Sequence, residues 1–256
     1  MNLRLDLAYD GTSFHGFARQ PDLRTVQGAI EDVLSRLFGL EVATVVAGRT
    51  DAGVHALGQV VSTADAPDDL DLVALRDKLN GMLGPEIAFS FVGEVPRDFS
   101  ARFSAKSRCY VYALRDGEVP DPFLVPTTWQ VKGALDVDLM NEAAGHLVGE
   151  HDFRSFGRLS HPDASGVRKL FELRSVRDGD LVRIRARANA FIQQMARSLV
   201  GTLAEVGTGK RAPDEIPAIL EARDRGAAGV VAPPKGLCLV SVEYDEGWSR
   251  PIDAAV

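Results

Sequence analysis

The sequence predicts an α+β protein made of two sheet-plus-helix subdomains. The 256 residues include 45% hydrophobic ones, enough to fill a sizeable core. Segments with the two-residue period of strands are mixed with segments that have the 3.6-residue period of amphipathic helices and with a hairpin. Each half of the chain has the order strand, helix, strands, helix, strand. We place the boundary near Phe103, which gives subdomains of residues 1–103 and 104–256.

The first half begins with a strand over residues 3–9, in which leucines alternate with polar residues, so a half-buried strand is expected. A helix follows, with Thr25 as its N-cap and Gly39 at its end. Apolar runs at 42–46 and 55–63 predict two strands joined by a glycine-rich loop. A helix over 70–79 and a strand over 87–95 complete this half.

The second half begins with a strand that ends near Leu114, and an irregular segment with three prolines follows at 116–133. Asp136 or Asp138 can cap the next helix. The dipeptide Asp178-Gly179 is a strong turn signal and predicts a hairpin. The remaining elements are a long helix over 190–206, a shorter helix over 213–223 and a strand over 237–244.

Composition excludes several classes of protein. The two cysteines, Cys109 and Cys238, lie far apart and outside any CxxC pattern, so neither a disulfide framework nor a zinc site is indicated. This is typical of the reducing cytoplasm, where we expect the protein. The N-terminus lacks the pattern of an export signal, and no apolar run approaches about 18 residues, so no membrane span is expected.

Charge is distributed unevenly along the chain. The net charge is −7, yet residues 154–211 hold twelve Lys and Arg against five Asp and Glu. That segment therefore carries +7 and the rest of the chain −14. Such asymmetry is typical of proteins that bind nucleic acid. A solvated strand face at the sequence RIRAR explains the charge equally well.

One candidate site lies in the stretch AGRTDAGVHALGQV at 47–60, where Asp51 stands among three glycines. A carboxylate on a glycine-rich loop is a common way to build a site. Asp is also frequent in turns, and Asp51 could simply be held by Arg49 or by backbone amides. His55 could act as a general base, although nothing marks it out from four other histidines. The chain has no HxxEH, paired-acid or GxSxG pattern, so metal and serine-nucleophile chemistry have little support.

Two further segments carry candidate residues. Tyr110 and Tyr112 share a strand face near the cations Arg102, Lys106 and Arg108, a pattern that suits stacking on a base and contact with phosphates. A core strand with a basic border is the alternative. In the helix over 190–206, Arg197 lies about 200° from Met195 and off the apolar stripe. It is either a solvated arginine or a charge in a cleft, where it would need a carboxylate such as Asp51.

Many ordered stretches of the chain resemble the tRNA pseudouridine synthases of the tRNA pseudouridine synthase A type. The most specific is GRTDAGVHA at 48–56, which is similar to the family's catalytic stretch. The resemblance is nearly full length and extends over YDGTSFHGF at 9–17, TVQGAIE at 25–31, LNGMLGPEI at 79–87, ARFSAKSRCYVY at 101–112, GEHDFRSF at 149–156, NAFIQQMARSLVGTLAEVGTGK at 189–210 and APPKGLCLVSVEY at 232–244.

This resemblance implies a cofactor-free and metal-free isomerisation of uridine to pseudouridine in the anticodon arm of tRNA, around positions 38 to 40, after the base is flipped out of its stack. It implies that Asp51 is the essential carboxylate, which could act as a nucleophile, a base or an electrostatic stabiliser. It also implies that Tyr110 stacks on the base, that Arg197 pairs with Asp51, and that Arg49 lies near the vacated stack. The family fold has two α+β subdomains with a cleft between them, and the family acts as homodimers.

The chain departs from the family pattern at a few positions outside the proposed catalytic residues. The family usually has other residues at Phe17, Ala18, Ser100, Ile192, Gln193 and Gln194. These departures bear on which uridines are modified, because such loops could touch the RNA. Two alternatives to the expected function are a catalytically silent tRNA-binding or RNA-chaperone protein and the same chemistry on a different RNA.

Overall fold

The computed structural model describes residues 1–161 and 163–245 of the chain. They form two compact units, one made of residues 1–106 together with 238–245 and the other of residues 107–237. Each unit combines a sheet with helices, so the predicted α+β class is confirmed. The predicted division at 103 assigned the last strand to the second subdomain, whereas in the structure this strand pairs with a strand of the first unit. A pairing between segments so distant in sequence leaves no local signal.

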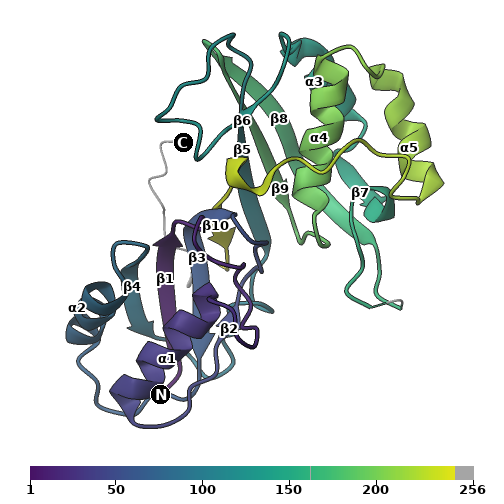
Figure 1. Cartoon of the computed structure of the whole chain (residues 1–256). Helices are drawn as coiled ribbons and strands as arrows, with labels where there is room; N and C mark the ends of the chain where they lie inside the picture. Colours follow the sequence, from purple (N-terminus) through teal and green to yellow (C-terminus); the bar gives the residue numbers. More distant parts are fainter. Residues whose placement is uncertain (162, 246–256) are drawn as a thin grey trace. The chain divides into compact units, whose positions relative to one another are not determined.

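The first unit is built on a sheet with the strand order β4, β1, β3, β10. Antiparallel pairs join β1 to both β4 and β3, while β10 runs parallel to β3, and the short β2 pairs with β3 antiparallel. Its elements are β1 (Leu3–Tyr9), α1 (Val26–Phe38), β2 (Val45–Val46), β3 (His55–Thr63), α2 (Leu72–Leu83), β4 (Ile87–Glu94) and β10 (Leu237–Glu243), as Figure 1 shows.

Strand β1 is buried on both faces, although its two-residue period predicted a half-buried strand. Arg4 and Asp6 are only 4% and 8% exposed. Arg4 Nε donates to Asp6 Oδ1 at 2.6 Å, and the guanidinium lies 4.9 Å from the ring centre of Tyr244. The two side chains are buried because β1 lies between two other strands and the ring of Tyr244 covers its polar face. The ion pair between them compensates the cost of burying the two charges.

Helix α1 begins and ends where the sequence predicted. Thr25 Oγ1 accepts a hydrogen bond from Gly28 N at 3.2 Å, which satisfies one of the free amides of the first turn. Gly39 ends the helix in the left-handed conformation with φ of 70°, which glycine adopts without a steric penalty. The buried face carries Ile30 and Leu34. Helix α2 begins after its cap Asp71 and runs four residues beyond the predicted end.

The second unit has an antiparallel sheet in the order β5, β9, β8, β7, with the short β6 parallel to β5. Helices α3 and α4 lie along one face of this sheet (Figure 1). The elements are β5 (Ser107–Arg115), β6 (Trp129–Gln130), α3 (Val137–Gly145), β7 (Gly149–Asp152), η1 (Phe153–Phe156), β8 (Val167–Asp178), β9 (Leu181–Ala188), α4 (Met195–Gly207), η2 (Pro213–Glu215), α5 (Ile216–Ala222) and η3 (Pro234–Gly236).

The hairpin around Asp178-Gly179 is confirmed, with Gly179 at φ of 58° and Asp178 opposite Leu181. Helix α4 is shorter than predicted, because the chain remains extended before it. Gln193 pairs with Arg158 through two backbone hydrogen bonds of 2.9 and 3.2 Å. Gln194 then adopts φ of 65°, which no helical residue has, so the helix begins at Met195.

Candidate active site around the Asp51 turn

Asp51 lies on a tight turn in the loop that joins β2 to β3. Its carbonyl oxygen accepts a hydrogen bond from Val54 N at 3.2 Å, and Gly53 has φ of 78°. A positive φ at the third of four residues is what a type II turn requires, and glycine supplies it. Asp51 itself is half-buried. The turn therefore holds the Asp51 backbone in place while leaving its side chain partly accessible.

A buried polar network lies directly behind this turn. The hydroxyls of Tyr9 and Thr50 are 2.8 Å apart, and Gln59 Nε2 donates both to Tyr9 Oη at 3.3 Å and to the carbonyl oxygen of Gly48 at 2.8 Å. Tyr9, Thr50 and Gln59 are 4%, 8% and 0% exposed. Burial raises the pKa of the Tyr9 phenol well above its usual value, so the hydroxyl keeps its proton. Two strands, β1 and β3, thus fasten the residues that precede Asp51.

The segment over residues 10–17 packs against the backbone of the same turn. Phe17 N donates to the carbonyl oxygen of Thr50 at 3.0 Å. Gly16 has φ of +94°, and a Cβ placed there would lie 3.1 Å from the Thr50 oxygen. A Cβ on Gly11 would lie only 2.0 Å from the carbonyl oxygen of Val54. The chain's own backbone therefore approaches this loop closely enough to require glycine.

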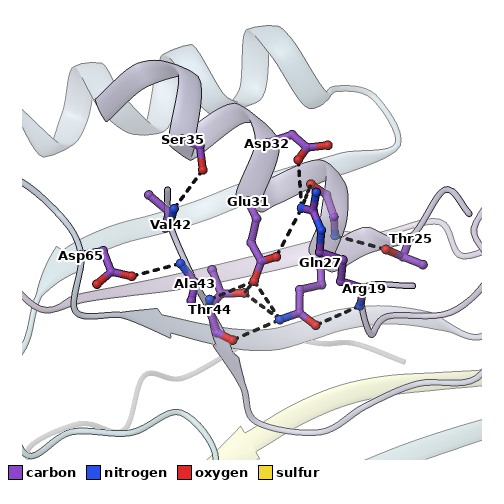
Figure 2. Close-up of polar contacts among 11 residues, drawn as sticks. Arg19, Thr25, Gln27, Glu31, Asp32, Ser35, Val42, Ala43, Thr44 and Asp65 are labelled. Carbon is purple, nitrogen blue, oxygen red and sulfur yellow. Dashed lines mark hydrogen bonds and ion pairs between the residues drawn. The ribbon is translucent and has the colours of Figure 1, made fainter. Parts of the chain in front are cut away.

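Helix α1 fixes the strand that leads into the loop (Figure 2). Glu31 is 7% exposed, and its Oε1 accepts hydrogen bonds from Thr44 N and Thr44 Oγ1, both at 2.9 Å. Gln27 Nε2 donates to the same oxygen at 2.8 Å and to the carbonyl oxygen of Thr44 at 3.1 Å. Since Thr44 directly precedes β2, this buried carboxylate connects the helix to the segment that enters the Asp51 loop.

His55 is held within the first unit in a way that does not favour a general base. Its Nδ1 lies 3.2 Å from Gly11 N and 3.1 Å from Asp10 Oδ1, and its Nε2 is buried. A hydrogen bond from Thr12, more than His55 itself, lowers the pKa of Asp10. Both ring nitrogens thus face the protein, and His55 contributes to the contact between the segment over 10–17 and β3.

The other predicted site residues of the first unit lie at its surface. Arg49 is exposed next to the Asp51 turn. Arg102 is exposed, with its guanidinium 5.3 Å from the ring centre of Phe103, which is itself 80% exposed. Lys106 is exposed, and its Nζ lies 3.2 Å from Asp245 Oδ2. These three cations are accessible to a polyanion.

Tyr110 and Tyr112 lie on one face of β5, as predicted, opposite Ala186 and Ile184 of β9. Tyr110 is 7% exposed and makes an edge-to-face contact with Phe191 at 5.0 Å. Tyr112 Oη donates to the carbonyl oxygen of Pro233 at 2.8 Å, and burial raises the pKa of its phenol. Tyr112 is therefore a core residue of the second unit.

Arg108 and Arg197 both bind carbonyl oxygens of the second unit. Arg108 is 9% exposed and donates from Nη1 to Asn189 at 2.8 Å, so it anchors the segment that precedes α4. Arg197, on α4, is half-buried and donates from Nε to Ala232 at 2.7 Å. Its charge also lowers the pKa of Tyr112, against the larger effect of burial. Arg197 is thus an ordered residue and not a freely solvated one.

The structure assigns the predicted residues to two groups. Asp51, Arg49, Arg102 and Lys106 belong to the first unit, and Tyr110, Arg108 and Arg197 belong to the second. The sequence did not identify the buried residues that support the Asp51 turn, namely Tyr9, Thr50, Gln59, Gln27 and Glu31. The sequence contains a weak sign that two of these polar residues are buried, because Gln59 interrupts an apolar strand and Glu31 lies on the apolar side of α1.

Residues 1–161 and 163–245 contain no group of three or more His, Cys, Asp or Glu side chains placed to hold a metal ion. No helix within these ranges is long and apolar enough to cross a membrane.

Comparison with known proteins gives a consistent result. Residues 7–104 and 143–245 match the family model described as tRNA pseudouridine synthase. The chain is 41% identical over 242 residues to tRNA pseudouridine synthase A of Geotalea uraniireducens. This alignment covers 94% of this chain and 99% of that protein. It is 44% identical to the protein of the same name from Brevibacillus brevis, over 94% of this chain and 99% of the relative.

A third relative and one solved structure extend the comparison. The chain is 42% identical to tRNA pseudouridine synthase A of Rhodopseudomonas palustris, over 94% of this chain and 98% of the relative. Among solved structures, an archaeal box H/ACA sRNP Nop10-Cbf5 complex aligns with 15% identity over 79% of this chain and 44% of that chain, at a TM-score of 0.35. A similarity this low does not bear on function.

Proposed function

The chain belongs to the tRNA pseudouridine synthase family, and from this premise we propose that it modifies the anticodon stem-loop of tRNA, around positions 38 to 40, with Asp51 as the essential carboxylate. As a member of this family it is an isomerase that converts uridine to pseudouridine in tRNA. The observation that carries the proposed role of Asp51 is its position at the first residue of a turn. Hydrogen bonds from β1, from β3 and from the segment over 10–17 hold the residues just before it.

The chemistry requires rearrangement within one nucleotide, without an external reactant. The C1′–N1 bond of uridine breaks, the detached uracil turns, C1′ bonds to C5, and the proton of C5 is lost while N1 gains one. An ionised carboxylate next to C1′ can stabilise positive character there, attack the sugar carbon or remove a sugar proton. The target base must leave its stack first, which costs a few kcal/mol. We propose that Arg49, which is exposed beside the turn, contacts the RNA from which the base has left.

Asp51→Ala tests the central part of this proposal. Purified wild type and variant are incubated with unmodified tRNA transcripts, and pseudouridine is mapped at each position. We expect no product from Asp51→Ala and full activity from Asp77→Ala, an exposed carboxylate on α2. Product formation by the Asp51 variant would refute its catalytic role. A wild type that binds tRNA but forms no pseudouridine would favour the RNA-binding alternative, and product outside the anticodon arm would refute the substrate position.

We further propose that Arg197 keeps Asp51 ionised and oriented, and that Tyr110 stacks on the uracil. An adjacent guanidinium lowers the pKa of a carboxyl. Arg197→Ala should therefore lower kcat and move the acidic limb of the kcat profile to higher pH. The matched control is Arg225→Ala, because Arg225 also donates to a backbone carbonyl of the second unit, that of Gly229 at 2.9 Å. An equal effect of both variants, or an unmoved pH profile, would assign Arg197 a structural role.

The remaining contacts and the assembly state belong to the same proposal. Arg102 and Lys106 are exposed and suited to phosphate contacts, whereas the buried Arg108 is better suited to holding the segment around Asn189. The protein is proposed to act in the cytoplasm as a homodimer without a cofactor. Light scattering of the purified protein measures its oligomeric state, and a monomeric mass at working concentration would refute the dimer.

A further inference from the structure

Strand β9 presents a row of arginines on one face of the sheet of the second unit. Arg183, Arg185 and Arg187 alternate with Val182, Ile184, Ala186 and Ala188, and the apolar set is almost fully buried. Alternate side chains of a strand point to opposite faces and repeat about every 7 Å. The three arginines therefore line up on the face opposite to the one that carries the buried residues.

The neighbouring strands neutralise this row only in part, although Glu172 of β8 lies opposite Arg187. On β5, the residues opposite the three arginines are Ala113, Val111 and Cys109, which carry no countercharge. On β8, Arg174 lies directly opposite Arg185. Like charges directly opposite each other in an antiparallel pair destabilise the sheet. The repulsion between two such arginines is reduced when an anion lies between their guanidinium groups.

The same face contains only two carboxylates on β8. Glu172 Oε2 lies 3.3 Å from Arg185 Nε, and Asp178 Oδ2 lies 3.3 Å from Arg183 Nη1. Five cations of β8 and β9 share the face, which we call the arginine face: Lys169, Arg174, Arg183, Arg185 and Arg187. Their charge exceeds that of Glu172, Asp178 and Glu150, the last of which lies opposite Lys169 on β7. Arg174 and Arg185 are both exposed. In a protein of net charge −7, this is a local reversal of sign.

We propose that the arginine face binds the sugar-phosphate backbone of the tRNA substrate, away from the base that reacts. This inference rests on the proposed function, because it takes tRNA as the partner. Guanidinium groups bind phosphate oxygens through paired hydrogen bonds, and a row of them follows a backbone without reading its bases. A phosphate between Arg174 and Arg185 would add to the partial compensation that Glu172 gives this pair.

The test compares two doubly substituted proteins of equal charge. Arg174→Gln with Arg185→Gln alters the arginine face, and Arg36→Gln with Lys78→Gln removes two exposed cations of the first unit as a control. We measure the Kd for an unmodified tRNA transcript at several KCl concentrations, kcat and KM for pseudouridine formation, and thermal unfolding. In the face variant we expect Kd and KM to rise about tenfold, kcat to stay unchanged, and the slope of log Kd against log salt to fall by about 2.

Thermal unfolding separates a binding role from a structural one. The substitutions remove a like-charge pair and also the partly exposed ion pair between Arg185 and Glu172, which contributes little to stability. The melting temperature of the face variant should therefore stay nearly the same while tRNA affinity falls. A Kd and salt slope equal to those of the control variant would overturn the proposal. A lower melting temperature with unaltered binding would overturn it too, as would a changed oligomeric state in light scattering. Failure of the proposed function can be told apart from failure of the arginine-face proposal. In the first case the wild type would form no pseudouridine, whatever its Kd for tRNA.

Discussion

Removing the hydroxyl of Tyr9 tests whether the buried network behind Asp51 positions the proposed catalytic loop. Tyr9→Phe takes one partner from Thr50 Oγ1, at 2.8 Å, and one from Gln59 Nε2, at 3.3 Å, in a region that water does not reach. Each buried polar group left without a partner costs about 1–3 kcal/mol. Gln59 keeps its bond to Gly48, so we expect the free energy of unfolding to fall by about 2 kcal/mol in total.

The effect on the reaction should exceed what lost stability explains. Thr50 directly precedes Asp51, and a small displacement of a reacting group is enough to slow a reaction by one or two orders of magnitude. We expect the single-turnover rate of pseudouridine formation to fall about tenfold, which corresponds to about 1.4 kcal/mol in the activation free energy. The Kd for tRNA should stay the same, because Tyr9 is buried and is not placed to contact RNA.

Tyr244→Phe is the matched control for this substitution. Tyr244 is 5% exposed in the same unit, and its hydroxyl donates to the carbonyl oxygen of Ala101 at 2.8 Å. It should lose similar stability in urea and keep its single-turnover rate. A Tyr9→Phe enzyme with the wild-type rate would refute the positioning role. An equal loss of rate in both variants would show that the effect is a general consequence of a destabilised unit.

Two further predictions concern a glycine and an ion pair. Gly16→Ala and Gly39→Ala both place a Cβ at positive φ and should each lose about 1–2 kcal/mol of stability in urea unfolding. Only Gly16→Ala should also lower kcat, since its Cβ presses on Thr50 while that of Gly39 meets nothing within 4 Å; equal kcat values would contradict this reasoning. Arg177 donates to both carboxylate oxygens of Asp116, at 3.0 and 2.8 Å, and this holds the pKa of Asp116 below its usual value. A carboxyl with a lowered pKa contributes stability that is complete above its unfolded pKa of about 3.9 and is lost as the pH falls through its folded pKa. In Asp116→Asn this contribution is absent, so the free energy of unfolding should depend less on pH below about pH 4 than in the wild type. An unchanged curve would show that the pair does not contribute.

The fold class and most element positions could be predicted because they depend on local patterns. The N-cap at Thr25, the helix end at Gly39 and the turn at Gly179 each use a chemical feature that is visible in a few residues. The double burial of β1 could not be predicted, since it depends on the neighbours of the strand and on Tyr244, more than 200 residues away. The start of α4 was misplaced because an apolar helical pattern continues through Ile192, while Gln193 pairs with Arg158 instead.

The site shows the same contrast between local and distant information. Asp51 could be proposed as a site residue because its whole stretch, from Gly48 to Ala56, is contiguous and specific. The side chains that hold it come from β1, β3 and α1, and each looks like an ordinary polar residue in its own segment. Their role depends on strand register, since a shift by one residue would turn Gln59 to the opposite face of β3. A candidate carboxylate can therefore be singled out from sequence, whereas the side chains that hold its turn in place become visible only when the strands are paired.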